Sequence, residues 1–211
     1  MRSGPPERNA ARVSRMSSNT PASALTVYTI GHSTRSEETF IALLHSYGVG
    51  EVVDVRRFPG SRRNPQFNRD SLEESLALAG IGYTHLPGLG GRRGSPDPAS
   101  PNTGWRVAAF QAYADRMAAP DWIAALDELE ELSRRKSVAY MCAEAVPWRC
   151  HRRLISDALT VRGFEIRHIL GPGRADPHQL PEFARVLSSG GIIYPSLVPV
   201  PWGDSMGADH E

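Results

Sequence analysis

Short apolar runs alternate with amphipathic helical patterns along the middle of this chain, and this alternation most constrains its fold. The apolar runs predict five strands, at Leu25–Ile30, Glu51–Val55, Tyr83–Leu86, Val138–Met141 and Glu165–Ile169. Helical spacing predicts helices at Ser36–Tyr47, Arg69–Ala79, Val107–Met117, Pro120–Arg134 and Trp148–Arg162. Strands that alternate with helices pair in parallel through right-handed crossovers. We therefore expect an α/β fold: a three-layer sandwich around a mostly parallel sheet of about five strands, Rossmann-like in the loose sense.

The two ends of the chain differ in composition from this core. Residues 1–24 are rich in Arg, Ser, Pro and Ala and lack the apolar segment of a secretory signal, which predicts a disordered leader. The core domain is predicted at 25–170. Residues 171–211 are rich in Gly and Pro and predict an irregular arm with a short helix at Glu182–Leu187. The polar stretch Gly88–Gly104 predicts a mobile loop over the site.

Composition and missing motifs exclude several classes of protein. A formal net charge of +1 argues against a globally basic protein that coats nucleic acid. Two cysteines cannot form a disulfide framework, and no apolar run approaches the roughly 20 residues that cross a bilayer, so we expect a cytoplasmic protein without a membrane partner. Neither a dinucleotide-binding glycine motif, nor a P-loop, nor a hydrolase serine elbow occurs, and no cofactor is predicted.

The segment from Met141 to Arg153 concentrates reactive groups between a predicted strand and a predicted helix. It holds both cysteines, one carboxylate, one imidazole and several guanidiniums. Glu144, facing His151, is a candidate general acid or base. Arg152, near the start of the helix with its free N–H groups, is a candidate ligand for phosphate or carboxylate. Cys142 is a candidate nucleophile, although a small buried apolar role explains it too.

Three other loops should meet this segment, because the carboxyl ends of parallel strands share one sheet edge. Each carries polar residues or glycine where a buried strand stops, and convergence of four such loops indicates a site. Asp54 is a candidate catalytic group, or else it caps a turn or pairs with an arginine. Phe67 or Trp105 is a candidate stacking surface for a base. The candidate substrate- or anion-binding residues are His32, Ser33, Arg56, Arg62, Phe67, Gly90, Gly91, Arg92 and Arg152.

The cysteine segment matches familiar chemistries only in part. Six residues separate Cys142 from Arg149, one more than the loop of cysteine phosphatases holds. A structural zinc site prefers more closely spaced cysteines, but a mixed metal site of Cys142, Cys150 and His151, with His32, is geometrically conceivable. Asp54 and Glu144 could also form a carboxylate pair for glycosidic hydrolysis.

Several motifs in this order resemble one bacterial family. They are Tyr28–Ser33, Asp54–Arg56 leading to Pro59 and Phe67, Leu89–Gly91, Tyr113–Ala114, and Met141–Glu144 with Cys150–Arg152. The chain resembles the family catalogued as domain of unknown function 488 over about Tyr28 to Ile169. The resemblance implies a compact bacterial α/β domain with these motif residues as working positions, and it adds Tyr113 to the candidate substrate-binding residues.

The leading hypothesis is an enzyme that acts on nucleic acid or a nucleotide. Arginines would hold phosphate, an aromatic ring would stack on a base, and Glu144 with His151 or Asp54 would transfer protons. Base excision and phosphodiester or glycosidic hydrolysis both fit, with DNA repair as one setting. A thiol or sulfur-handling enzyme that uses Cys142 or Cys150 is the second hypothesis, and a non-catalytic module that binds an anion or nucleic acid is the third.

Overall fold

Six strands form the central sheet of the computed structural model, which describes residues 24–91 and 94–197. Their spatial order is β3-β2-β4-β1-β5-β6. The strands are β1 (Thr26–Gly31), β2 (Glu51–Asp54), β3 (Gly82–His85), β4 (Val138–Cys142), β5 (Glu165–Gly171) and β6 (Arg174–Pro177). The first five pair in parallel, and β6 pairs antiparallel with β5. The predicted α/β fold with a mostly parallel sheet is confirmed, with one strand more than expected.

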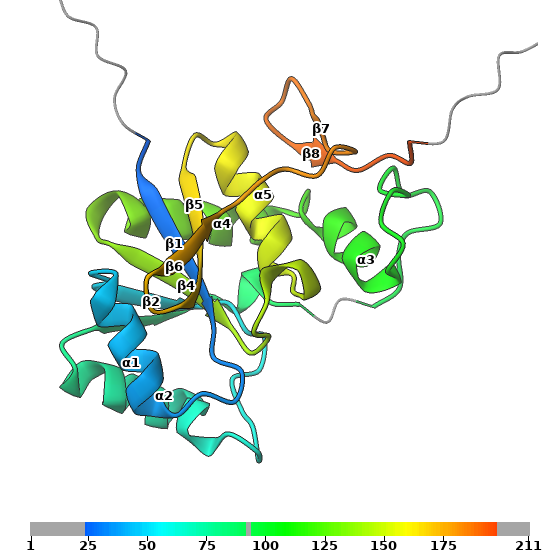
Figure 1. Ribbon diagram of the computed structural model, residues 1–211. Helices are drawn as coiled ribbons and strands as arrows, with labels where there is room; N and C mark the ends of the chain where they lie inside the picture. Colours follow the sequence, from blue (N-terminus) through cyan, green and yellow to red (C-terminus); the bar gives the residue numbers. More distant parts are fainter. Residues whose placement is uncertain (1–23, 92–93, 198–211) are drawn as a thin grey trace, which may run out of the picture.

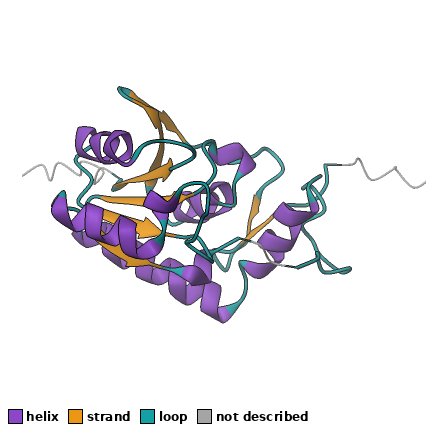
Figure 2. Cartoon of the chain, turned by 90° about the horizontal axis from the view of Figure 1, so that it is seen from below, coloured by secondary structure: helices purple, strands orange, loops and turns teal. Residues whose placement is uncertain are grey.

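Helices cover both faces of this sheet (Figures 1 and 2). One buried apolar cluster joins the sheet to α1 (Glu37–Ser46) and α2 (Arg69–Leu78). A second cluster, on the opposite face, joins it to α3 (Ala108–Arg116), α4 (Pro120–Arg135) and α5 (Arg152–Val161). Two separate cores, one on each side of a sheet, make the three-layer sandwich that the sequence predicts.

Side-chain alternation along β4 directs its last residue toward the second helix layer. Val138, Tyr140 and Cys142 belong to the core shared with α3, α4 and α5, whereas Ala139 and Met141 belong to the core shared with α1 and α2. Successive residues of a strand point to opposite faces of the sheet. Cys142 therefore projects toward the face on which α5 packs.

The helix after β4 begins later than predicted. A 3-10 turn, η3 (Pro147–Arg149), follows the loop, and α5 starts only at Arg152. Cys150 stands between the two with an extended backbone, φ −130° and ψ 146°, which breaks the helical path. The interruption places Cys150 at the end of the loop rather than on the helix, close to the end of β4.

The segment after residue 171 is more regular than predicted. Its first part forms β6, and the predicted helix Glu182–Leu187 is wrong: β7 (Arg185–Val186) pairs there with β8 (Ile192–Ile193). The amide of Leu187 donates to the carbonyl of Gly191, closing a tight turn that favours strands over a helix. The predicted leader lies, apart from its last residue, outside the described residues.

The loop predicted to cover the site is anchored elsewhere in its described part. A short turn, η2 (Pro87–Leu89), begins it. Asp115 of α3 accepts hydrogen bonds from the amide of Asp97 and from Asn102 Nδ2, at 2.9 and 2.8 Å. Of the described residues in this loop, only Gly91 lines the pocket at the strand ends.

Across the described ranges, no helix is both long and apolar enough to cross a bilayer.

Gly31 tests how tightly the end of β1 packs. A Cβ there would overlap the carbonyl oxygen of Glu144 and would lie 2.9 Å from Arg152 Nη2. We expect Gly31→Ala to lower the free energy of unfolding by about 3 kcal/mol or more. Neither neighbour can move aside easily, because one is backbone and the other is a guanidinium held by hydrogen bonds. Gly60→Ala, where a Cβ meets no atom within 4 Å, is the matched control. Equal denaturation midpoints for the two variants would contradict the close packing.

Candidate functional site

A pocket of about 670 Å³ opens at the carboxyl ends of β1, β2 and β4. The β1–α1 loop contributes His32 and Ser33, and the loop after β2 contributes Arg56, Arg57 and Phe58. The end of β4 contributes Cys142, the loop after it contributes Cys150, and α3 adds two aromatic residues. The sequence-predicted candidates that line the pocket are His32, Ser33, Arg56, Gly91, Tyr113, Cys142, Glu144 and His151, together with Cys150 from the metal alternative.

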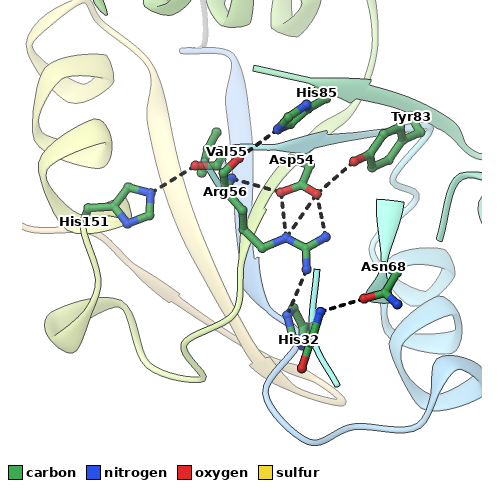
Figure 3. Close-up of polar contacts among 9 residues, drawn as sticks. His32, Asp54, Val55, Arg56, Asn68, Tyr83, His85 and His151 are labelled. Carbon is green, nitrogen blue, oxygen red and sulfur yellow. Dashed lines mark hydrogen bonds and ion pairs between the residues drawn. The ribbon is translucent and has the colours of Figure 1, made fainter. Parts of the chain in front are cut away.

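Asp54 and Arg56 form a buried ion pair (Figure 3), and Arg56 presents one wall of the pocket while Asp54 lies behind it. Arg56 Nη2 donates to Asp54 Oδ2 at 2.6 Å, and Nε contacts both carboxylate oxygens at 2.9 and 3.1 Å. The Tyr83 hydroxyl also donates to Oδ2, at 2.9 Å. Asp54 is fully buried and does not line the pocket. Of the three roles considered for it, the structure shows the two structural ones: Asp54 pairs with Arg56, and its Oδ1 accepts from the backbone amide of Arg56 at 3.0 Å.

His32 continues this wall as a neutral imidazole. Its Nδ1 lies 2.9 Å from the carbonyl of Ser33, and its Nε2 lies 3.3 Å from Arg56 Nη1 (Figure 3). Because a carbonyl only accepts and a guanidinium only donates, Nδ1 carries the hydrogen and Nε2 accepts. Burial and the charge of Arg56 lower the pKa of His32 to about 4. Ser33 beside it adopts φ 52°, a strained conformation that often marks functional sites.

Two predicted stacking surfaces are structural instead. Phe67 is fully buried and stacks beneath His32, with ring centroids 4.2 Å apart and an interplanar angle of 18°. Trp105 is only 7% exposed and packs against Phe110, Phe183 and Tyr194. The prediction that either ring stacks on a base is therefore wrong, because neighbouring side chains already cover both.

Cys142, Cys150 and His151 meet at the floor of the pocket. His151 Nδ1 lies 3.9 Å from Cys142 Sγ and 3.7 Å from Cys150 Sγ. The other ring nitrogen, Nε2, lies 3.2 Å from the carbonyl of Val55 and so carries the hydrogen of the neutral ring (Figure 3). In the neutral ring Nδ1 therefore faces the two sulfur atoms as an acceptor, and once it has taken a thiol proton it donates to the thiolate that is left. Gly91 packs on this ring, and a Cβ there would lie 2.9 Å from Nδ1.

Arg152 lies beneath the pocket and not in it, which corrects its predicted contact with substrate. It is 1% exposed, and its Nη1 and Nη2 donate to Thr29 Oγ1 and to the carbonyl of Glu144, at 2.8 and 2.6 Å. Among the described residues no carboxylate forms an ion pair with it, and its Nε has no hydrogen-bond partner. The pocket floor thus contains a buried positive charge.

This environment gives the two thiols different acidities. Burial raises the pKa of Cys150, but hydrogen bonds from Cys142 and His151 and the charge of Arg152 outweigh it, and the pKa falls well below its ordinary value. The hydrogen bond to Cys150, together with burial, raises the pKa of Cys142. One proton lost from the pair therefore leaves the negative charge on Cys150.

The pocket rim carries exposed charged and aromatic side chains. Glu144, Arg57, Phe58 and Arg149 are exposed there. Other candidates lie off the pocket: Arg62 is exposed but does not line it, Gly90 packs against Arg57, and Arg92 falls outside the described residues.

Tyr113 is held in place behind His151. Its hydroxyl donates to the carbonyl of Leu89 at 2.7 Å and accepts from Trp122 Nε1 at 3.0 Å, and its ring centroid lies 5.3 Å from that of His151. Sequence reasoning missed Phe110, which lines the pocket from the same helix. Its spacing of three residues from Tyr113 places both on one helix face and was the available signal.

The buried Asp54–Arg56 pair predicts a large difference between two similar substitutions. Asp54→Asn leaves the buried Arg56 without its counterion and should lower the free energy of unfolding by about 3–5 kcal/mol. Asp176→Asn is the matched control, because Arg174 and Asp176 form an exposed pair with the same sequence spacing. We expect no measurable change there. Denaturant unfolding of both variants checks this, and equal effects would refute a special role for the buried pair.

The pKa of His32 predicts a pH dependence of stability. Between the ordinary value of 6.5 and the folded value of about 4, the unfolded chain binds a proton that the folded protein excludes. Stability should therefore fall as pH falls through this window. His32→Gln should reduce that slope by up to about 1.4 kcal/mol per pH unit. Unfolding free energies measured across the window test this, and an unchanged slope would show that His32 does not contribute.

Comparisons with known proteins place the chain in one family. The sequence model of the family described as domain of unknown function DUF488 matches residues 36–159. The motif at Tyr28–Ser33 lies just before the matched span, although it contributes His32 and Ser33 to the pocket. No curated protein and no solved structure matched. The match spans more than half of the chain and confirms the resemblance read from the motifs, so this protein belongs to the DUF488 family.

Proposed function

We propose that this protein is an enzyme that hydrolyses a nucleotide or a bond within nucleic acid. One observation carries the proposal: a single pocket joins the Cys142, Cys150 and His151 cluster and the carboxylate of Glu144 to a rim of exposed arginines. Reactive groups at a pocket floor beneath cationic residues suit an anionic substrate whose reacting atom reaches the floor.

The rim supports a nucleotide or nucleic acid as the substrate class. Arg57 and Arg149 are exposed along it, and both can contact phosphate. Phe58 is 69% exposed, and the guanidinium of Arg57 lies 5.3 Å from the centre of its ring. Exposed aromatic rings between arginines are typical of surfaces that stack bases and follow a phosphate backbone. Phe58 thus replaces Phe67 as the proposed stacking residue.

Proton transfer falls to Glu144 in this proposal. The carboxylate of Asp54 is buried and bonded to Arg56 and Tyr83, and the unprotonated nitrogen of His151 faces sulfur. Glu144 is exposed and lines the pocket. A cytoplasmic location, where thiols stay reduced, suits a pocket with two free cysteines and remains part of the proposal.

A thiol-dependent enzyme is the second candidate. The lowered pKa of Cys150 favours it, because hydrogen bonds from Cys142 and His151 overcome the effect of burial on that thiol. A thiolate is the nucleophilic form of cysteine. Rapid alkylation of Cys150 in the folded protein, with loss of activity, would favour this candidate over hydrolysis by an activated water.

Binding of labelled single-stranded DNA, RNA and a nucleoside triphosphate across a salt series tests the substrate class. For the DNA and RNA we expect log Kd to rise linearly with log salt, and Arg57→Ala and Arg149→Ala should each reduce the slope by about one. Arg135→Ala, an exposed arginine of α4 that does not line the pocket, is the control. Absence of binding to all three probes at low salt would overturn the proposal.

Glu144→Gln separates an enzyme from a binding module. An enzyme should keep its affinity for the bound probe and lose turnover by about 100-fold or more, since general acid–base catalysis contributes about that much. A module would show no turnover in either form.

A further inference from the structure

We propose that Cys142, Cys150 and His151 bind a thiophilic divalent ion of the zinc class and leave one coordination position open to the pocket. Their ligand atoms, two sulfurs and one nitrogen, all lie within 4.8 Å of one another. The metal site stands on this geometry alone. Only its catalytic use rests on the proposed function.

The distances in the cluster suit tetrahedral coordination. Zinc lies about 2.3 Å from thiolate sulfur and about 2.0–2.1 Å from imidazole nitrogen, so a tetrahedron places sulfur and nitrogen about 3.6 Å apart. The two sulfur–nitrogen distances here are 3.9 and 3.7 Å. Shifts of a few tenths of an ångström would therefore bring both sulfur–nitrogen distances to the tetrahedral value.

The ligands are also oriented as metal ligands usually are. A metal-bound histidine generally donates its other N–H to a backbone carbonyl or a carboxylate, which fixes the ring and its tautomer. In the same way, His151 Nε2 donates to the carbonyl of Val55, and its Nδ1 faces both sulfur atoms. Cys142 ends β4, and its carbonyl accepts from the amide of His32 at 3.0 Å, so regular structure holds this ligand.

Three protein ligands leave a fourth position for water or substrate, as in catalytic rather than structural zinc sites. All three ligands line the pocket, as does Glu144, which is not part of the cluster. Two thiolates, one imidazole and a glutamate that is not a ligand are also the groups with which zinc deaminases of nucleobases activate water. Here the metal-bound water would give a proton to Glu144, its oxygen would attack the substrate, and the leaving group would take that proton.

Burial and charge favour ligands over a nucleophile. Cys142 and Cys150 are only 7% and 2% exposed, which limits attack by either sulfur on a large substrate. Two thiolates and the guanidinium of Arg152 together carry one net negative charge. Adding a divalent ion gives the floor one net positive charge. That charge suits an anionic substrate held by Arg57 and Arg149.

Titration of the reduced full-length protein with Co²⁺, followed by visible absorption, tests the site. We expect one ion per chain and a thiolate-to-cobalt charge-transfer band that Zn²⁺ abolishes. Cys142→Ser, Cys150→Ser and His151→Gln should each weaken binding by more than about 100-fold, above the effect of losing an outer-shell partner. His45→Gln, an exposed histidine of α1, should bind as the native protein does.

A second measurement does not depend on how the variants fold. The chain has two cysteines, so a thiol reagent reports on this cluster alone. Zn²⁺ should slow modification of both by at least about 10-fold, and a chelator should reverse the protection. Stoichiometry below one tenth of an ion per chain, or unprotected thiols, would overturn the metal site. Turnover that persists with a chelator would also overturn its catalytic use, while leaving the proposed function intact.

Discussion

The site depends on the hydrogen bonds of the buried Arg152 guanidinium. This guanidinium joins the start of α5 to Thr29 in β1 and to the backbone of Glu144 in the loop after β4. Burial of a guanidinium without a carboxylate is costly unless hydrogen bonds and nearby negative charge compensate. The hydrogen bonds are present, and the thiols above it supply the charge once they ionise. The bare backbone of Gly31 provides the space for this arrangement.

The pocket therefore has a buried floor and an exposed rim. Its wall is fixed, because Asp54 holds Arg56, Arg56 bonds to His32, and His32 stacks on Phe67. The exposed residues above, including Arg57, Phe58 and Arg149, have no comparable burial. Reactive groups act best when packing and hydrogen bonds hold them in place, as they do at this floor.

The sequence predicted which segments meet at the site, but only some of the side chains that face it. His32, Glu144 and His151 line the pocket, whereas Asp54, Phe67 and Arg152 are buried outside it. Valine-rich β2 and apolar β4 are recognisable as buried strands, and parallel pairing then brings their ends together. Asp54 and Glu144 look alike in sequence, since each carboxylate comes at or just after a strand. They differ because Tyr83, on a neighbouring strand, and Arg56 surround the first. Such contacts come from tertiary packing, which local patterns do not contain.

The same limit explains Phe67 and the end of the chain. Phe67 stands among arginines in sequence, yet Phe40 and His32 enclose it from other elements. β6 holds arginine, aspartate and proline, and so lacks an apolar pattern; it forms because the edge of β5 offers unpaired backbone groups.

The contacts of Asp157 have a consequence for the size of the folding unit. This fully buried carboxylate of α5 accepts hydrogen bonds from His178 and Tyr194, at 2.7 and 2.8 Å. The family match covers residues 36–159. Both partners lie beyond its end, and β1, which pairs with β4, lies before its start. A fragment cut to the matched span would lose β1 from the middle of its sheet. It would also leave the buried carboxylate of Asp157 without its two hydrogen-bond partners. The packed structure therefore continues on both sides of the matched span, from β1 to Tyr194, and the family's recognisable signature is shorter than the fold that carries it.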